Sequence, residues 1–157
     1  MIRVAKLEDY PDMDKLFRLS ANQLCQSVYT SEQLKSWAGR PWPERFMRNS
    51  SEGHQQYVMT RERRVICFGI IDVMAKNIVA LFVHPKYSGQ NIGHEMMKFL
   101  LQQAAERQID SLTLDSSLNA VNFYRRHGFS EIGRSTFTTQ NGTNLESVQM
   151  IKHLDSK

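Results

Sequence analysis

One segment constrains the fold more than any other. Residues 81–100, LFVHPKYSGQNIGHEMMKFL, join an apolar run, a short polar loop with two glycines and an amphipathic run without interruption. The apolar run predicts a buried strand, and the helical spacing of Met96, Met97, Leu100 and Leu101 predicts a helix over residues 93 to about 107. The first N–H groups of such a helix lack intrahelical partners and carry partial positive charge. The segment therefore predicts a seat for an anion such as a pyrophosphate.

Further apolar segments predict the rest of a sheet. The runs VICFGIID (65–72) and NIVALFVH (77–84) are short and rich in β-branched side chains, which is typical of central strands covered on both faces. A third strand is predicted for SLTLD (111–115), and a short helix ending at Gly128 follows it. The Asn141–Gly142 pair lies between two strand-like runs and predicts a terminal β-hairpin.

The first fifty residues favour helices. Apolar residues at helical spacing predict a helix over residues 8–26. Thr30 and Gln33 have the spacing of a capping box, and Gly39 is a stop signal, so a second short helix is predicted between them. The Pro41 and Pro43 pair predicts a turn into one more short helix, and a strand is predicted to start near residue 54.

Composition favours one soluble domain. The chain has 157 residues with 41% hydrophobic content, enough to close a single core, so we expect one α/β (α+β) domain over residues 1–157. No apolar run is long enough to span a bilayer, and the chain starts without the apolar stretch of a signal peptide. We therefore expect a soluble, cytoplasmic protein without membrane contact. The net charge of +4 suits a phosphorylated small ligand as well as nucleic acid.

Three sharper motifs are incomplete. HEMMK begins like the zinc-binding HExxH helix, but Lys98 stands in place of the second histidine, so we expect no metal. Gly89 and Gly93 lie without the third glycine of GxGxxG or the Lys-Ser/Thr pair of GxxxxGK, and binding of nucleoside triphosphates loses its main support. Cys25 and Cys67 lie among apolar residues and form no CxxC pair, which predicts two reduced core thiols.

The loop, together with NAVNFYRRHGF at 119–129, resembles the GCN5-related N-acetyltransferases, the GNAT superfamily. The resemblance covers residues 65–130 by order of elements. It implies the GNAT fold, a mixed and mostly antiparallel central sheet with a splayed parallel strand pair, flanked by helices. It also implies acetyl-CoA as the donor. The segment YTSEQLKSWA (29–38) is similar to a sparsely characterised bacterial branch of the superfamily and implies no particular acceptor.

Two positions of the phosphate loop depart from the family pattern, which is Arg or Gln, two residues, Gly, one residue, then Gly or Ala. Ser88, Asn91 and Gly93 stand at the three defined positions here. Asn91 is the milder change, because asparagine tolerates the left-handed backbone that a glycine would adopt. Ser88 removes a side chain that would meet the phosphates. The candidates to compensate for it are Lys86, Lys98, Arg125 and Arg126.

The second block fits the family more closely. Ala120, Phe123, Tyr124, Gly128 and Phe129 fit the run A-x-x-Φ-Y-x-x-x-G-F, in which Φ is apolar. In the family this tyrosine lies near the thioester sulfur and is the usual general acid, so the resemblance implies that role for Tyr124. Spacing alone would favour a partly buried core phenol.

The resemblance also implies a set of donor contacts. The strand over residues 78–84 would splay from the strand over 111–116, and Phe82 and Val83 would pair with pantetheine and polarise the thioester carbonyl through their main chains. The pyrophosphate would sit over the loop. The implied cofactor-binding residues are Phe82, Val83, Ser88, Gly89, Gln90, Asn91, Ile92, Gly93, His94, Ser117, Asn119 and Arg126, with Asn122 as a further candidate. For Ser117, Asn119 and Asn122, helix capping around Asn119 is an equally strong alternative.

A general base is less clearly marked. NIVALFVH has no carboxylate, and Asp72, Asp115 and His84 remain candidates, with an exposed or capping role as the alternative for each. A water chain, or an acceptor amine of low pKa, would make a base unnecessary. The N-terminal helices and the final hairpin are expected to bind the acceptor. Tyr29 and Trp37, with Trp42, are candidates for an aromatic wall there, and ordinary packing is the alternative.

The sequence therefore favours an N-acetyltransferase, a monomer or homodimer, in which a small-molecule or peptide amine attacks acetyl-CoA directly. The alternative is a non-catalytic GNAT-shaped module that binds CoA or another ligand and regulates without turnover, and it is motivated by Ser88, Asn91 and the missing base. Nucleic-acid binding ranks last, because the basic residues are scattered and no aromatic-basic repeat accompanies them.

Overall fold

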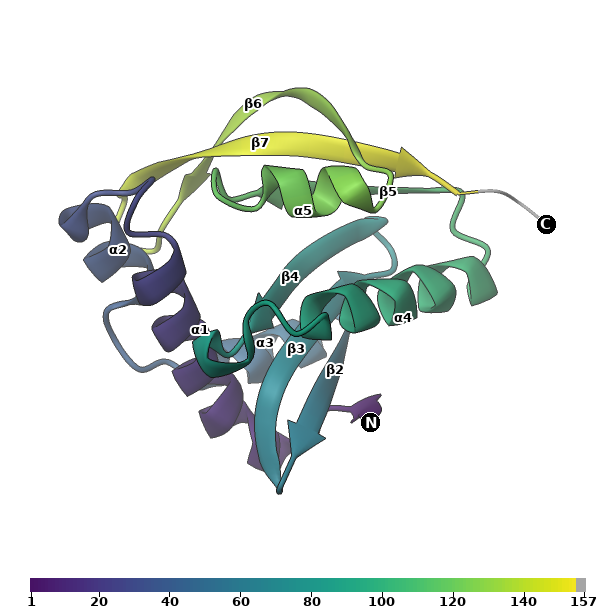
Figure 1. The fold of residues 1–157 in the computed structure, drawn as a ribbon, viewed down its shortest axis with the longest axis horizontal. Helices are drawn as coiled ribbons and strands as arrows, with labels where there is room; N and C mark the ends of the chain where they lie inside the picture. Colours follow the sequence, from purple (N-terminus) through teal and green to yellow (C-terminus); the bar gives the residue numbers. More distant parts are fainter. Residues whose placement is uncertain (155–157) are drawn as a thin grey trace.

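The computed structural model describes residues 1–154 and forms a seven-stranded sheet with helices on both faces (Figure 1). The strand order is β1-β2-β3-β4-β5-β7-β6, and every neighbouring pair is antiparallel except β4 and β5. The strands are β1 (Ile2–Val4), β2 (His54–Arg61), β3 (Arg64–Asp72), β4 (Asn77–Val83), β5 (Ser111–Ser116), β6 (Ser130–Thr138) and β7 (Asn144–His153). The helices are α1 (Tyr10–Leu24), α2 (Ser31–Ala38), α3 (Glu44–Ser51), α4 (Ile92–Glu106) and α5 (Val121–Arg126). The predicted fold class is confirmed.

Helix α1 begins two residues later than predicted. Residues Leu7–Asp9 form a 3-10 turn, and Pro11 lies in the first turn of α1, where its missing N–H leaves no bond unmade. Cys25 leaves the helical conformation, so α1 also ends sooner than predicted. The capping box of α2 is confirmed, because Thr30 Oγ1 accepts from the Gln33 N–H at 3.1 Å and the Gln33 side chain accepts from the Thr30 N–H at 2.9 Å.

Helices α1, α2 and α3 cover one face of β2, β3 and β4. Leu16 and Phe17 of α1 and Phe46 of α3 are buried against Phe68 of β3. The rings of Phe46 and Phe68 meet edge to face at 5.4 Å, and those of Phe17 and Phe82 at 5.0 Å. This aromatic packing fixes the N-terminal helices on the half of the sheet that ends at β4.

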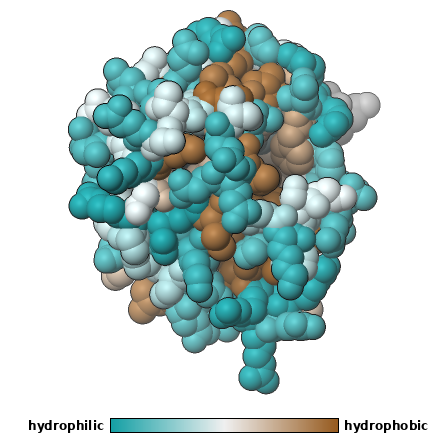
Figure 2. Space-filling model, turned by 60° about the vertical axis from the view of Figure 1, so that its left-hand side comes forward, coloured by the Kyte–Doolittle hydropathy of each residue, from teal (hydrophilic) through white to brown (hydrophobic). Residues whose placement is uncertain are grey.

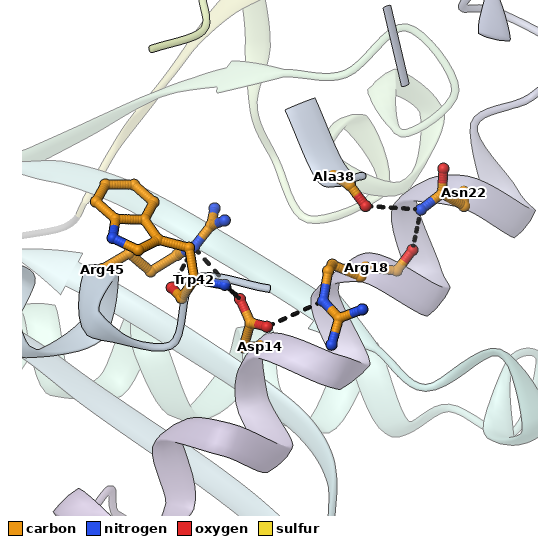
Figure 3. A network of polar contacts seen from close by, with 6 residues as sticks. All are labelled: Asp14, Arg18, Asn22, Ala38, Trp42 and Arg45. Carbon is orange, nitrogen blue, oxygen red and sulfur yellow. Dashed lines mark hydrogen bonds and ion pairs between the residues drawn. The ribbon is translucent and has the colours of Figure 1, made fainter. Parts of the chain in front are cut away.

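A buried carboxylate ties the same helices together (Figure 3). The Asp14 side chain on α1 is only 2% exposed, and it accepts hydrogen bonds from Arg18 Nε at 2.9 Å and from the Trp42 main-chain N–H at 3.1 Å. Arg45 Nε of α3 lies 3.7 Å from the other side of the carboxylate. Asn22 donates to the last carbonyl of α2 at 2.9 Å. Buried charge needs such partners, so the network holds α1, α2 and the segment before α3 in one arrangement.

The two central strands differ from each other. Residues 65–71 of β3 are all buried, as predicted, and α4 packs so closely on this strand that a Cβ at Gly69 would lie 2.8 Å from Leu100 Cδ1. In β4 only Ile78 is buried, which corrects the prediction of a strand covered on both faces. The reason is that β4 pairs with β5 at Asn77 alone and then separates from it.

The C-terminal half of the sheet is joined to the N-terminal helices at its tip. The hairpin predicted around Asn141 and Gly142 is confirmed as the turn between β6 and β7. Gln33 Nε2 of α2 donates to the Asn144 carbonyl at 3.0 Å, so the tip of the hairpin lies on α2 (Figure 1, left). Over residues 1–154, the helices are too short or too polar to cross a membrane.

Candidate active site

The site is organised by the separation of β4 from β5. The register between these parallel strands contains the single pair Asn77 and Thr113, and Asn77 Nδ2 reinforces it by donating to the Thr113 carbonyl at 3.1 Å. Beyond that pair the strands diverge, toward the left of Figure 1. Past Asn77, the backbone N–H and C=O groups of β4 that face β5 therefore have no strand partner among residues 1–154, and they are available to a ligand.

The register of β4 on β3 decides which main-chain groups face the gap. The His84 N–H donates to the Ile66 carbonyl at 2.8 Å, and bonded and non-bonded pairs alternate along an antiparallel ladder. Phe82 therefore directs its N–H and C=O toward β3. Leu81 and Val83 direct theirs toward β5. Of the two residues predicted to serve through their main chains, Val83 has the required orientation, and Leu81 rather than Phe82 is its companion.

The loop between β4 and α4 has the backbone of an anion seat. Asn91, the N-cap of α4, has φ +64°, the left-handed conformation that the family's glycine would take, and Gly89 has φ +80°. Ser88, Gly89 and Gln90 are exposed, and the N–H groups of Ile92 and Gly93 open α4. Asn91 thus preserves the backbone, while Ser88 leaves the loop without a cationic side chain at its own position.

Gly93 brings three elements into contact at the start of α4. A Cβ at this position would lie 3.2 Å from the Phe123 ring of α5 and 3.3 Å from Val83 Cγ2 of β4. The glycine therefore permits α4 to approach both the strand that carries the free main-chain groups and the helix that carries Tyr124.

Tyr124 is a buried phenol, 8% exposed, between the rings of Phe123 and Phe129. Burial raises its pKa, and the nearby Cys67 thiol adds to the effect. Within residues 1–154 its hydroxyl has no hydrogen-bond partner. The group therefore keeps its proton at neutral pH and is free to donate it.

The turn before α5 is tied to the N-terminal helices. The Asn119 side-chain oxygen accepts from Cys25 Sγ at 3.3 Å, and the Tyr29 hydroxyl accepts from the Leu118 N–H at 3.2 Å and donates to the Glu146 carbonyl at 2.6 Å. The N-cap of α5 is Ala120, without a side-chain bond, so the alternative of helix capping by Asn119 is wrong. Burial raises the pKa of Cys25 to about 11, which agrees with the predicted core thiol.

The basic side chains near α5 fall into two groups. Arg125 is engaged, because it donates to Asn122 at 2.8 Å and to Glu131 at 2.5 Å. Arg126 is exposed and has no carboxylate partner within residues 1–154. The predicted donor contact Asn122 is thus already bonded to Arg125, whereas Arg126 remains available to an anion.

A pair of histidines was not predicted from the sequence as a pair. His94 of α4 and His127, which ends α5, face each other with Nδ1 and Nε2 2.6 Å apart. Burial, followed by the charges of His94 and nearby cations, lowers the pKa of His127. Because the two histidines lie 33 positions apart in the chain, no spacing rule would have joined these side chains.

The candidate bases are mostly committed elsewhere. Asp72 of β3 accepts a hydrogen bond from the Ala75 N–H at 3.1 Å and pairs with His54 Nε2 at 3.3 Å. It lies opposite Asn77, at the first residue of β4, where β4 and β5 are still paired. His84 Nδ1 accepts from the Lys86 N–H at 3.1 Å and so caps the following turn. Asp115 is exposed on β5. In residues 1–154 no three His, Cys, Asp or Glu side chains gather in the way a metal site requires.

On the opposite side of β4 an aromatic cluster joins three elements. The Trp37 ring of α2 lies 6.2 Å from Phe82 of β4, 6.4 Å from Phe137 of β6 and 6.0 Å from Tyr29. Phe137 is 46% exposed and Trp37 and Phe82 are half-buried. Figure 2, with this side of the molecule turned forward, shows hydrophobic surface in a band between hydrophilic residues. Trp42 lies outside the cluster, against Arg45 and Arg48.

The hairpin tip is fixed over this cluster by hydroxyl groups. Ser36 Oγ of α2 and Thr139 Oγ1 lie 2.7 Å apart, and Thr139 Oγ1 donates to Asn141 Oδ1 at 2.6 Å. Thr139 also accepts from the Thr143 N–H at 3.1 Å. The site therefore has two sides, one formed by the loop, α4 and α5, and the other by α1, α2 and the β6–β7 hairpin.

Known proteins share both the sequence pattern and this architecture. A family model described as an acetyltransferase (GNAT) domain matches residues 25–154. An uncharacterized N-acetyltransferase of Escherichia coli K12, YafP, is 24% identical over 127 residues, which cover 79% of this chain and 77% of that protein.

Solved structures agree with the family model. A GCN5-related N-acetyltransferase from Rhodopseudomonas palustris has a TM-score of 0.89 and 28% identity, covering 98% of this chain and 95% of the other. The PaiA N-acetyltransferase from Thermoplasma acidophilum, solved with coenzyme A, has a TM-score of 0.78 and 19% identity, with 98% of both chains covered. The chain therefore belongs to the GNAT family of acetyl-CoA-dependent N-acetyltransferases.

Proposed function

We propose that this protein transfers the acetyl group of acetyl-CoA to an amine by direct attack of the amine on the thioester. The observation that carries the proposal is how closely three elements meet at Gly93. This residue of α4 lies against Val83 of β4, whose edge separates from β5, and against Phe123, which precedes the buried Tyr124 on α5. A long, thin donor with a diphosphate at one end and a thioester at the other would follow one path over the loop before α4, along β4 and toward Tyr124.

Each part of the path has a chemical task. The N–H groups at Gly89 to His94 bind the diphosphate, and the exposed guanidinium of Arg126 on α5 is a further candidate to contact it. The main-chain groups of Val83 and Leu81 pair with the pantetheine amides and polarise the thioester carbonyl, because donors aimed at a developing oxyanion stabilise the transition state. Ser117 and Asn119 stand at the thioester end as polar groups beside the pantetheine.

Tyr124 is the proton donor to the leaving thiolate. Its raised pKa keeps the phenol protonated while the thioester is intact. A thiolate formed in the same apolar surroundings is costly without a hydrogen bond, so the proton moves toward sulfur as the bond to the carbonyl carbon breaks. The attacking nitrogen loses its own proton to water, because Asp72 is held by Ala75 and His54 and Asp115 is exposed to solvent on β5.

The acceptor side favours an amine with an apolar body. Trp37, Phe82 and Phe137 offer aromatic surface rather than charge. Because none of the candidate bases within residues 1–154 is positioned at the site, the enzyme favours amines with a substantial neutral fraction at working pH. Small aromatic amines and apolar peptide N-termini meet both conditions, whereas polyamines meet neither.

The test is release of CoA thiol from acetyl-CoA in the presence of an amine panel that contrasts aromatic amines, apolar dipeptides and polyamines. We expect turnover with the first two groups. Tyr124→Phe should reduce kcat by about 10²-fold or more, with the acetyl-CoA affinity unchanged. Full activity of this variant with the best acceptor would disprove the acid assignment.

A second function is favoured by the exposed Ser88 and by the lack of a positioned base in the part of the chain that the structure describes. The protein would then bind CoA and regulate without turnover. Saturable CoA binding with no acetylated product across the whole panel would support it, and any turnover lost in Tyr124→Phe would eliminate it.

A further inference from the structure

The contact between His94 and His127 joins the anion seat to the helix that carries Tyr124. His94 is the third residue of α4, and its ring packs at 5.1 Å from the Phe123 ring. His127 lies at the end of α5, three residues after Tyr124, and packs on the same ring at 5.0 Å. The facing nitrogens are 2.6 Å apart, so one imidazole donates and the other accepts a single hydrogen.

This geometry limits the protons that the pair can hold. When both rings are neutral, a single hydrogen lies between the two facing nitrogens. One further proton can be added at a ring nitrogen that does not face the other ring, which is His94 Nε2 or His127 Nδ1. Two imidazolium rings would turn two N–H groups toward each other, which the 2.6 Å separation forbids. The pair therefore switches between neutral and singly charged, as one coupled unit.

In the free protein the surroundings disfavour a charged His127. Partial burial has the largest effect, followed by the charges of His94, of Arg126 on α5, of Lys152 on β7 and of Lys98 on α4, and together they lower the pKa of His127. A bound anion would offset the cations and reverse the preference.

We propose that His127 is a positioning residue that lets His94 bind the donor diphosphate as an imidazolium, in place of the arginine that Ser88 replaces. When the diphosphate arrives over the first turn of α4, a proton from solvent joins the pair. His94 then donates one N–H to a phosphate oxygen and the other to the neutral ring of His127. Charge-assisted bonds of this kind are about twice as strong as neutral ones. The inference rests on the donor site of the proposed function.

Reciprocity makes the inference measurable. If donor binding takes up a proton, then lower pH strengthens donor binding by the same coupling free energy. We expect the Kd to rise by up to about tenfold per pH unit between the pKa of the free pair and that of the occupied pair. The adenosine 3′-phosphate of CoA titrates in the same range, so dephospho-CoA is the probe.

The experiment is calorimetric titration with dephospho-CoA between about pH 6 and pH 8, in pairs of buffers with different ionisation enthalpies. Wild type should show proton uptake near neutral pH and a Kd that rises with pH. His94→Gln and His127→Phe should lose both signals. His127→Gln, whose amide reaches the position of Nε2 and can accept from His94, should restore part of the affinity.

The control is His153→Gln, an exposed histidine at the end of β7, which should retain both the uptake and the pH dependence. Tight binding of dephospho-CoA that is independent of pH and takes up no proton would overturn this inference and leave the donor site standing. No binding of either dephospho-CoA or acetyl-CoA would instead overturn the donor site itself. Proton uptake that persists in His127→Phe would show that His94 binds the donor without His127, and it would overturn the positioning role of His127.

Discussion

The donor side and the acceptor side of the proposed site differ in the groups that they offer to a ligand. On the donor side, the groups available to a ligand are mainly backbone N–H and C=O groups, set by the left-handed Asn91 and by the register of β4 on β3. On the acceptor side they are side chains, with Trp37, Phe82 and Phe137 brought together from α2, β4 and β6. Local turn geometry and the pairing of β4 with β3 produce the first side, whereas the packing of side chains from distant elements produces the second.

This difference explains why the two sides can change independently of each other. A diphosphate and a pantetheine chain are recognised by regularly spaced backbone groups, which any sequence compatible with the turn provides. An acceptor is recognised by the shape and polarity of side chains, which can change without altering the fold. Donor and acceptor variants should therefore fail in separable ways.

The largest separable effect is expected from Gly93→Val. Its side chain would push against the Phe123 ring and Val83 and move the start of α4 away from β4 and α5. Overpacking of this kind costs about 1–3 kcal/mol, so the Kd for acetyl-CoA should rise by about tenfold to 10²-fold if that cost falls on the donor site. The matched control is Gly133→Val, because no atom lies within 4 Å of a Cβ there. Calorimetric titration of both variants with acetyl-CoA tests the prediction. Equal affinities of the two variants would contradict the assignment of the donor site to the start of α4.

A smaller and opposite pattern is expected from Trp37→Leu. The variant keeps an apolar side chain on α2 but loses the ring contacts with Phe82 and Phe137. We expect the KM for an aromatic amine to rise about tenfold while the Kd for acetyl-CoA stays unchanged. Trp42→Leu, outside the cluster, is the control. If both constants change together in steady-state kinetics, the two sides are not separable.

The scaffold under the acceptor side is tested by Asp14→Asn. The amide keeps the size of the side chain but leaves Arg18 and Arg45 without a counter-charge. Unfolding in urea should show a loss of about 1–3 kcal/mol. Glu131→Gln removes the exposed ion pair with Arg125, 2.5 Å long, and should cost about 0–1 kcal/mol. An equal loss in the two variants would contradict a special role for the buried network.

The smallest effect concerns Cys25, where the two sides meet through Asn119. Alkylation requires the thiolate, and burial raises the pKa of this thiol to about 11, so the thiolate is scarce at neutral pH and increases only as pH approaches that value. Treatment with iodoacetamide near neutral pH should leave the melting temperature and donor affinity unchanged. Mass spectrometry should find Cys25 unmodified until the protein is unfolded. Rapid labelling of the folded protein would show that the junction opens.

Prediction from the sequence succeeded where the signal was local. The capping box of Thr30 and Gln33, the hairpin at Asn141 and Gly142 and the helix that starts beyond Asn91 were each marked by neighbouring residues, and each is confirmed. The three residues of β1 were missed, because a strand that short has no pattern of its own. The half-exposed β4 was misjudged, because an apolar run reports the potential for burial and not the presence of a partner strand.

The sequence by itself determined the order of the main helices and strands other than β1, the turn before α4 and the position of Tyr124 on the helix after β5. Turns, caps and glycine-dependent backbone depend on residues a few positions apart. Tertiary structure alone decided that Leu81 rather than Phe82 faces the gap and that Trp37 joins the wall while Trp42 does not. It also brought His94 against His127. Strand register and the packing of distant helices are set by the whole core, and no local spacing encodes them.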